Sequence, residues 1–146
     1  MSIKVKIINQ SDNPLPEYKT LGSSGMDVRA FTSKKLSVPP LERVLVKTGI
    51  FLEMETGIEC QVRPRSGLAL KQGLTVLNTP GTVDADYRGE IGVILINLSN
   101  KEAFVENGDR IAQLVFSKVE SIDWEQVEST GNTERGSGGF GSTGLK

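Results

Sequence analysis

Short runs in which apolar and polar residues alternate, each bounded by a turn signal, constrain the fold of this chain more than any other feature. Ile58 to Arg63 alternates cleanly, and Arg43 to Met54 is rich in β-branched and apolar residues. Glu90 to Leu98 and Ile111 to Val119 are strongly apolar. A period of two is typical of strands, whereas a helix repeats its apolar positions every three to four residues. Many short strands with frequent turns predict an all-β sandwich or barrel.

Turn signals separate these runs, and one helix interrupts them. Ile3, Val5 and Ile7 alternate with lysines and predict a first strand. The only helix that we expect spans Ser66 to Gln72, and Gly73 should end it, because glycine readily adopts the left-handed conformation that follows a helix. The turn signals are Asn13-Pro14, Pro39-Pro40, Thr56-Gly57, Pro80-Gly81, Arg88-Gly89 and Asn107-Gly108.

The run from Ile91 to Leu98 is apolar on both of its faces. In a small β domain, such a strand is buried on both sides or packs one side against another subunit. We favour the subunit contact, because one small sandwich has little room for a doubly buried strand.

The residue types that the chain lacks restrict its chemistry. Its 146 residues suffice for one domain with a real core, and none of them is histidine. No imidazole can therefore act as a general base, and zinc sites of Cys and His are excluded because Cys60 is the only cysteine. Cys60 shares an alternating face with Ile58 and Val62, which predicts a buried core thiol. Hydrolytic chemistry would have to use carboxylates, Mg²⁺, arginines and hydroxyls.

Charge and hydropathy indicate a cytoplasmic protein with no nucleic-acid or membrane partner. The formal net charge is -1, whereas binding a long phosphate backbone needs a basic excess. A small polyphosphate remains possible, because a few arginines suffice to bind it. Met1 to Asn9 lacks the apolar run of a signal peptide, and no stretch approaches the length of a membrane helix. One cysteine cannot form an intrachain disulfide, which suits a reducing compartment.

The composition changes near the end of the chain. Residues 129–146 are mostly Gly, Ser and Thr and carry no core-forming pattern, so we divide the chain into a core of residues 1–128 and an arm of residues 129–146. A plain flexible tail has no use for Arg135 and Phe140, which stand among these glycines. The glycines match the G-x-G-x-x-G dinucleotide pattern, but that fingerprint needs a following helix, and the chain ends almost at once. Free amides, hydroxyls, one cation and one ring could instead close over a phosphate chain and a base.

Four segments beside turns carry further polar residues. Arg65 precedes the expected helix, where the backbone amides of Ser66 and Gly67 would form a phosphate cradle, although Ser66 could equally be an ordinary helix cap. Asp84 and Asp86 would share one face if they lay on a strand. The two carboxylates would then need a cationic partner. The four segments are Ser24–Ala30, Pro64–Leu70, Asn78–Glu90 and Gly108–Phe116.

Several of these residues have ordinary explanations as well. Asp27 follows a glycine, where an Asp commonly bonds local backbone amides. Arg110 opens a strand in which Gln113 is the only other polar residue, and both could simply meet solvent. Arg88 or Arg110 could supply the cation for the carboxylates of the third segment. The amide of Asn78 has a donor and an acceptor, which suits the edge of a base.

The four segments and the arm resemble, in order, the five motifs of the trimeric dUTP diphosphatase (dUTPase) family. Pro64–Ala69 and Arg135–Gly144 carry the most specific part of the resemblance, and Ser24 stands where the family often has Ala. The resemblance implies a jelly-roll-like β barrel or sandwich, one short helix, a flexible C-terminal arm and a homotrimer with shared active sites. It also implies hydrolysis of dUTP to dUMP and pyrophosphate with Mg²⁺, which keeps uracil out of DNA and supplies dUMP for thymidylate synthesis.

The resemblance also implies a role for each matching residue. Asp84 is similar to the general base that activates water for attack on the α-phosphorus, and Asp27 to the residue that meets Mg²⁺ through bound water. Tyr87 resembles the ring under the deoxyribose, and Phe140 the ring that stacks on uracil. The remaining substrate-binding residues would be Arg65, Ser66, Gly67 and Gln113 at the phosphates, Asn78, Gly81, Thr82 and Val83 at uracil, and Arg135, Gly141 and Ser142 in the arm.

Three other functions compete with this one. A dCTP deaminase shares the family fold, but its catalytic Glu would fall at Ile94, which cannot move protons, and it lacks the glycine-rich arm. A nucleotide-sensing regulator could keep every motif, so the sequence does not exclude a second role. A binding module without catalysis would not explain Asp27, Asp84 and Gln113 together.

Overall fold

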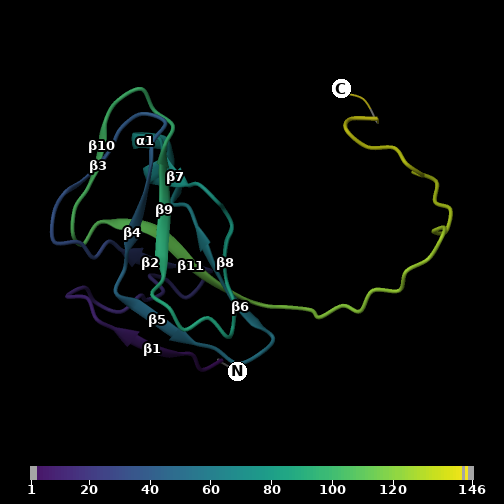
Figure 1. Ribbon diagram of the computed structural model, residues 1–146, viewed down its shortest axis with the longest axis horizontal. Coiled ribbons are helices and arrows are strands. Elements are labelled where there is room, and N and C mark those ends of the chain that lie inside the picture. Colours follow the sequence, from purple (N-terminus) through teal and green to yellow (C-terminus); the bar gives the residue numbers. More distant parts are fainter. Residues whose placement is uncertain (1–2, 143, 145–146) are drawn as a thin grey trace.

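The computed structural model describes residues 3–142 and 144 and consists mainly of short antiparallel strands (Figure 1). One helix, α1 (Ser66–Gln72), lies between the sixth and seventh strands. The strands are β1 (Lys6–Asn9), β2 (Met26–Arg29), β3 (Leu36–Val38), β4 (Arg43–Lys47), β5 (Ile50–Glu53), β6 (Ile58–Arg63), β7 (Leu74–Val76), β8 (Gly81–Val83), β9 (Gly92–Asn97), β10 (Ala103–Val105) and β11 (Arg110–Lys118).

The strands form four antiparallel sheets around one core. Their orders are β2-β11-β6-β8, β4-β9-β7, β1-β5 and β10-β3. Most neighbours are distant in sequence, as in β11 with β2 and β4 with β9. The prediction of an all-β, jelly-roll-like sandwich is confirmed, and within the described residues the sheets do not close into a barrel.

The apolar run from Arg43 to Met54 contains two strands, β4 and β5, which belong to different sheets. The chain turns between them at Gly49, whose φ of 69° is left-handed. A Cβ at Gly49 would lie 2.8 Å from the backbone nitrogen of Ser11, so a side chain has no room at this corner. Thr48 is buried, and its Oγ1 donates to the carbonyl of Ile91 at 2.6 Å, which fixes the corner to the chain before β9.

The first strand begins later than its alternation predicts. β1 starts at Lys6 and pairs with the four residues of β5 alone, from Lys6 opposite Glu53 to Asn9 opposite Ile50. Ile3 precedes the strand and is 50% exposed. The paired segment of β5 ends at Glu53, opposite Lys6, and the alternation of Ile3 and Val5 does not reveal this limit.

The helix agrees with its prediction at both ends. α1 spans Ser66–Gln72, and Gly73 follows it with φ 68° and donates its N–H to the carbonyl of Ala69 at 3.0 Å. No residue of α1 is buried, so local sequence signals and the flanking strands determine where this helix forms. No helix in the described part of the chain has the length or apolarity needed to cross a bilayer.

The core is formed by the inward faces of the strands, and Cys60 is part of it. Cys60 is fully buried between Ile58 and Val62 on β6, as the alternation predicted. Burial, with a smaller contribution from the negative charge of Glu59, raises the pKa of the Cys60 thiol to about 12. Every buried side-chain polar atom among the described residues has a hydrogen-bond partner.

We predict that Cys60 resists alkylation at pH 8 in the folded protein and reacts once the chain is unfolded in urea. Its pKa is above the ordinary 9.0, so between pH 9 and about pH 12 the folded state keeps the thiol protonated while the unfolded state loses the proton. The resulting stabilisation is complete below pH 9 and declines by about 1.4 kcal/mol per pH unit from there towards pH 12. Mass spectrometry after iodoacetamide treatment measures the labelling. Rapid labelling of the native protein would contradict the buried placement.

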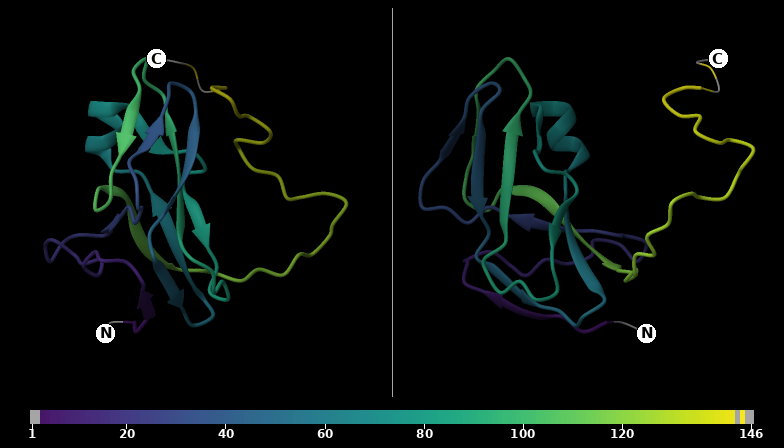
Figure 2. Two further views of the ribbon diagram at one scale, coloured as in Figure 1. Left: turned by 60° about the vertical axis from the view of Figure 1, so that its left-hand side comes forward. Right: turned by 45° about the vertical axis from the view of Figure 1, so that its right-hand side comes forward.

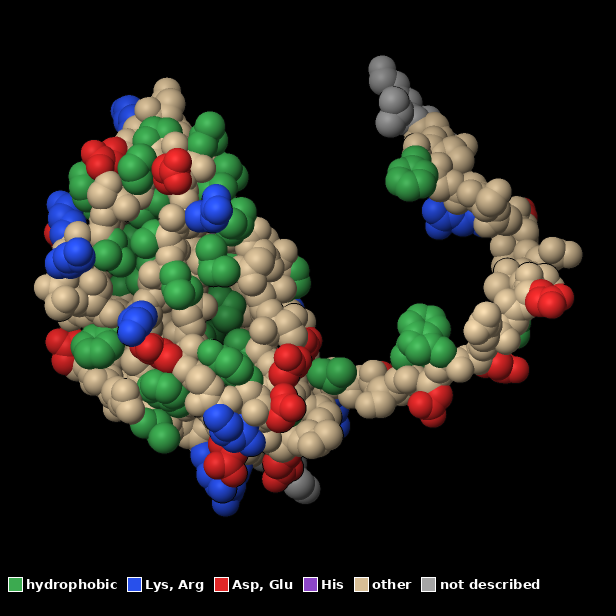
Figure 3. Space-filling model, viewed as in Figure 1, with side chains coloured by type: hydrophobic (Ala, Val, Ile, Leu, Met, Phe, Trp, Pro, Cys, Tyr) green, Lys and Arg blue, Asp and Glu red, His purple; other side chains and the backbone are tan. Residues whose placement is uncertain are grey.

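β9 has one buried and one partly exposed apolar face. Val93 and Leu95 point into the core, whereas Ile94 and Ile96 are only partly buried within this chain. Leu45, opposite Ile94 on β4, is 61% exposed. Figure 3 shows hydrophobic side chains spread over the face that β4 and β9 cross. One chain therefore does not bury this strand on both sides.

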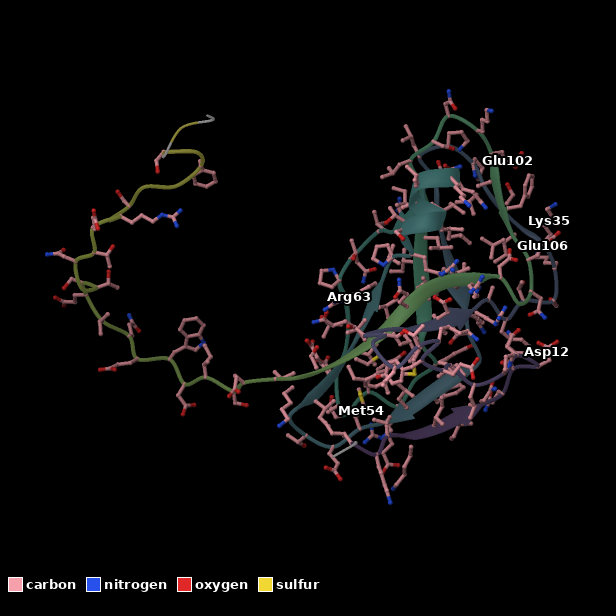
Figure 4. All side chains as sticks on the ribbon, turned by 180° about the vertical axis from the view of Figure 1, so that it is seen from behind. Asp12, Lys35, Met54, Arg63, Glu102 and Glu106 are labelled. Atoms are coloured by element: carbon pink, nitrogen blue, oxygen red, sulfur yellow. The ribbon has the colours of Figure 1, made fainter. Side chains whose placement is uncertain are left out.

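The described chain after β11 contains no strand or helix and runs away from the core (Figures 1 and 2). Val119 N–H, directly after β11, donates to the carbonyl of Gly57 at 3.0 Å, and the hydrogen bonds farther along are local, such as that from Nε of Arg135 to the carbonyl of Gly138 at 2.8 Å. Trp124 is 90% exposed on the segment that leads to the arm. Figure 4, in which Arg63 marks the end of β6, shows the side chains of this segment projecting from an extended chain.

Candidate active site

A polar hollow of about 210 Å³ lies where β2, β11 and the start of α1 meet. It brings residues of the first, second and fourth predicted segments together, although these are far apart in the sequence. Its lining residues are Lys19, Ser23, Gly25, Asp27, Arg65, Ser66, Gly67 and Gln113.

Asp27 joins two arginines at this hollow. Its Oδ1 accepts a bond from Nε of Arg65 at 2.9 Å, and its Oδ2 accepts one from Arg110 at 3.2 Å. Arg65 also donates to the backbone carbonyl of Arg110 at 3.2 Å. The Asp27 side chain is 18% exposed, so the pair with Arg65 is partly shielded from water. Asp27 therefore orients two guanidinium groups, and the alternative of an Asp that bonds local backbone amides is wrong.

The start of α1 offers free backbone donors beside Arg65. Arg65 itself is the N-cap residue, with φ −98° and ψ 125°, and no side chain caps the helix. Ser66 is therefore not the N-cap. The first amides of a helix have no partner within it, so the N–H groups of Ser66 and Gly67 are available to an anion. Both residues are exposed, and both line the hollow.

Gln113 is fixed in the hollow by a glycine and a proline. Opposite Asp27 in the β2–β11 register, it donates its Nε2 to the carbonyl of Pro64 at 3.4 Å. A Cβ at Gly25 would lie 2.7 Å from Oε1 of Gln113 and 3.3 Å from the Cβ of Gln113. Glycine at position 25 therefore leaves the space that the Gln113 side chain occupies.

A second hollow, of about 170 Å³, lies beyond the end of β8. It contains Asp84 and Tyr87 from the third predicted segment. Its full lining is Thr82, Val83, Asp84, Tyr87, Glu90, Ile91 and Gly92. Among residues 3–142 and 144, no three His, Cys, Asp or Glu side chains converge in a way that could hold a metal ion, here or in the first hollow.

The expected pairing of Asp84 and Asp86 on one strand face is wrong. β8 ends at Val83, and both carboxylates lie in an exposed turn in which Tyr87 N–H donates to the Asp84 carbonyl at 3.1 Å. Neither expected cation pairs with them. Arg88 donates to the carbonyl of Ala85 at 2.7 Å, and Arg110 binds Asp27 instead.

Tyr87 is held over a glycine at the edge of the second hollow. Its hydroxyl donates to the Glu90 carbonyl at 3.1 Å, and a Cβ at Gly89 would lie 2.5 Å from its Cζ. The side chain of Glu90 accepts the N–H of Gly49 at 2.9 Å, which ties this turn to the corner between β4 and β5. The ring of Tyr87 remains 46% exposed and is available to a ligand.

β8 presents free backbone groups next to Asn78. In the described four-stranded sheet it is an edge strand, with β6 as its partner along Gly81–Val83. The N–H and C=O groups on its outer edge therefore have no strand partner. Asn78 is exposed in the turn before β8, and its Nδ2 lies close to Gly81.

The two hollows are separate within one chain and share no lining residue. The β6–β8 register places Val83 opposite Cys60, whereas Arg65 lies beyond the other end of β6. Five residues of nearly extended chain separate Cys60 from Arg65, which corresponds to about 16 Å. Asp84 follows Val83 and lies farther still from Arg65.

The predicted residues of the arm lie away from both hollows. Arg135, Phe140, Gly141 and Ser142 are exposed, and no hydrogen bond or ion pair joins them to the core in the described chain.

Sequence reasoning missed several residues of the two hollows. Lys19 and Ser23 precede the first segment and have no pattern that marks them. Ile91 and Gly92 follow the third segment and were assigned only to a strand. The ion pairs of Arg65 and Arg110 with Asp27 span 38 and 83 residues of sequence, so only the fold reveals them.

The sequence matches a family model described as dUTPase over residues 4–144. Curated relatives named deoxyuridine 5'-triphosphate nucleotidohydrolase include one from Finegoldia magna, 53% identical over 142 residues that cover 97% of this chain and 99% of the relative. One from Treponema denticola is 58% identical over 131 residues, covering 90% of this chain and 91% of the relative. One from a Hydrogenobaculum species is 53% identical over the whole of both chains.

Solved structures agree on the fold. A variant dUTPase of Staphylococcus bacteriophage 80alpha with dUpNHpp superposes with a TM-score of 0.86 at 23% identity, over 97% of this chain and 99% of that chain. A variant dUTPase of phage phi11 of S. aureus, described for its coordination of a structural Mg(II) ion, has a TM-score of 0.78 at 20% identity and covers 88% of this chain and 99% of that chain.

Proposed function

This chain belongs to the dUTPase family, and from that premise we propose that it hydrolyses dUTP to dUMP and pyrophosphate. The observation that carries the proposal is the first hollow, where Arg65, held by Asp27, converges with two free helix amides and a fixed glutamine. Such a set of donors suits a chain of phosphates. The activity would keep uracil out of DNA and supply dUMP for thymidylate synthesis.

The phosphate-binding residues would neutralise and orient the substrate. Arg65 presents its remaining donors while Asp27 holds its Nε, and the amides of Ser66 and Gly67 add uncharged donors beside it. Gln113, fixed by Gly25, contributes a side-chain amide at the same place. Groups already held in position stabilise developing charge without having to reorganise during the reaction.

The nucleoside would bind at the second hollow. The outer edge of β8 at Gly81, Thr82 and Val83 and the amide of Asn78 offer donors and acceptors to the uracil edge. Tyr87, held over Gly89, would pack against the deoxyribose. Asp84 would take a proton from the water that attacks the α-phosphorus, which is the role of a general base.

Mg²⁺ fits this donor set only as an ion that arrives with the substrate. Both carboxylate oxygens of Asp27 accept bonds from guanidinium groups, so its contact with the metal would be indirect, through bound water. Mg²⁺ is commonly held largely by substrate phosphates and water, and few protein ligands are then needed. When bound, the ion supplies charge neutralisation for the phosphates.

We further propose that the site is shared among the subunits of a homotrimer. Asp84 and Arg65 are separated by more than about 16 Å in one chain. The water that Asp84 would activate must nevertheless attack the phosphate chain that Arg65 would bind. Residues of a second copy would bring the two hollows together. The partly exposed face formed by Ile94 and Ile96 of β9 and Leu45 of β4 offers an apolar contact for such an assembly.

The arm, residues 129–146, would complete the site from another subunit. Arg135 and Ser142 would contact the γ-phosphate, Phe140 would stack on uracil, and Gly141 would allow a close approach of the backbone. Gly141 has φ 84°, which a residue with a side chain rarely adopts. Closing the arm over bound substrate would exclude water from the reaction. We also propose a cytoplasmic location, because the single thiol of Cys60 suits a reducing compartment.

Product analysis tests the proposed reaction. Purified protein is incubated with Mg²⁺ and with either dUTP or dCTP, and the nucleotides, pyrophosphate, orthophosphate and ammonia are quantified. We expect dUMP and pyrophosphate in equal amounts. Release of dUDP and orthophosphate would overturn the position of attack, and release of ammonia from dCTP would favour the deaminase.

A further inference from the structure

The first hollow contains one cation that none of the five segments supplies. Lys19 lines it together with Ser23, Arg65 and Gln113. Both residues belong to a loop that precedes β2, outside the residues assigned to substrate so far.

Hydrogen bonds between Thr20 and Ser23 fix the backbone next to Lys19. Thr20 N–H donates to Oγ of Ser23 at 3.1 Å, and Ser23 N–H donates to the Thr20 carbonyl at 3.1 Å. The two hydroxyls lie 2.9 Å apart. The backbone beside Lys19 is therefore a closed turn, while the long side chain of Lys19 keeps its own freedom.

Of the two cations that line the hollow, Lys19 is the less firmly paired one. Arg65 and Arg110 share the partly buried Asp27, whereas Lys19 pairs with Glu17, whose side chain is 68% exposed. The hydrogen bond and the charge of Lys19 lower the pKa of the Glu17 carboxyl. An ion pair exposed to solvent contributes little free energy, so exchange of Glu17 for a more highly charged anion is easy.

We propose that Lys19 is an additional phosphate-binding residue, which leaves Glu17 and contacts the pyrophosphate portion of the substrate or product. This inference rests on the proposed function, because it assigns the first hollow to the phosphate chain. Glu17 acts as the resting partner that keeps the ammonium at the rim when no anion is bound. Lys19 would affect affinity for the polyphosphate and leave the proton transfer at Asp84 unchanged.

Binding of pyrophosphate in the presence of Mg²⁺, measured by calorimetry on the full chain, tests the inference directly. We expect Lys19→Met to raise the Kd about three- to tenfold, as for the loss of one charge-assisted contact in water. Lys19→Arg should keep most of the affinity, and Glu17→Gln should lower the Kd. Lys6→Met is the matched control, since Lys6 also forms an exposed ion pair, with Glu53 at 2.7 Å, but lies outside the hollow.

Steady-state kinetics with dUTP separate this inference from the proposed reaction. Lys19→Met should raise KM by a similar factor and leave kcat within about twofold, because the contact is made equally in the ground and transition states. An unchanged Kd, or equal losses in Lys19→Met and Lys6→Met, would overturn the role of Lys19. Lys19-dependent pyrophosphate binding without any dUTP turnover would support the subsite and contradict the proposed reaction.

Discussion

Replacing Asp84 with Asn is expected to lower kcat for dUTP by about 10²- to 10⁴-fold, the usual contribution of a general base. The amide keeps the size of the carboxylate but cannot accept the proton of the attacking water. Asp84 lies exposed in the turn after β8, where no ion pair or buried contact depends on its charge. Affinity for dUTP, measured by calorimetry with the inactive variant, should therefore stay within about twofold of the unmodified protein.

Asp86 provides a matched control for this prediction. It is an exposed carboxylate in the same turn, two residues away, and lies outside the lining of the second hollow. Asp86→Asn should retain nearly full kcat. Full activity in Asp84→Asn, or an equal loss in both variants, would contradict the assignment of Asp84 as the base.

Deleting residues 129–146 is expected to lower kcat/KM for dUTP by about 10²-fold or more without unfolding the protein. The deletion removes Arg135 and Phe140, and with them the proposed closure over the substrate. The described arm has no hydrogen bond or ion pair with the core of its own chain, so the thermal midpoint of unfolding should hardly change. Steady-state kinetics and a thermal melt measure the two effects.

Two point variants locate the loss within the arm. Arg135→Met should reproduce a large part of it, because it removes the only cation of residues 129–142. Glu134→Gln, at the neighbouring exposed position, should leave the kinetics unchanged. A truncated protein with full kcat/KM would show that the arm takes no part in the site.

Features set by local chemistry could be predicted from the sequence. The bounds of α1 follow from a short apolar stretch and from Gly73, whose left-handed φ needs no information from the rest of the fold. The buried face of β6 follows from strict alternation, which places Cys60 between Ile58 and Val62. The candidate site residues of the four segments and the arm could be listed for the same reason, because each segment is a local sequence pattern.

Features set by pairing between distant segments could not be predicted in the same way. The corner at Gly49 depends on Ser11, which leaves no room for a side chain, and alternation continues through it. The partner of Arg110 is Asp27 rather than the nearby carboxylates, because the β2–β11 register brings residues 83 positions apart together. The separation of Asp84 from Arg65 follows from the β6–β8 register, which no property of either residue reveals.

Mixed trimers test the central claim, a site built from more than one chain, most directly. Arg65→Met and Asp84→Asn, each expected to be inactive alone, are co-expressed with different tags, and trimers that carry both tags are isolated. If one chain supplies Arg65 and its neighbour supplies Asp84, each mixed trimer regains one intact site, or about one third of the activity of the unmodified trimer. Mixed trimers as inactive as their parents, or a protein that is monomeric in solution, would contradict the shared site.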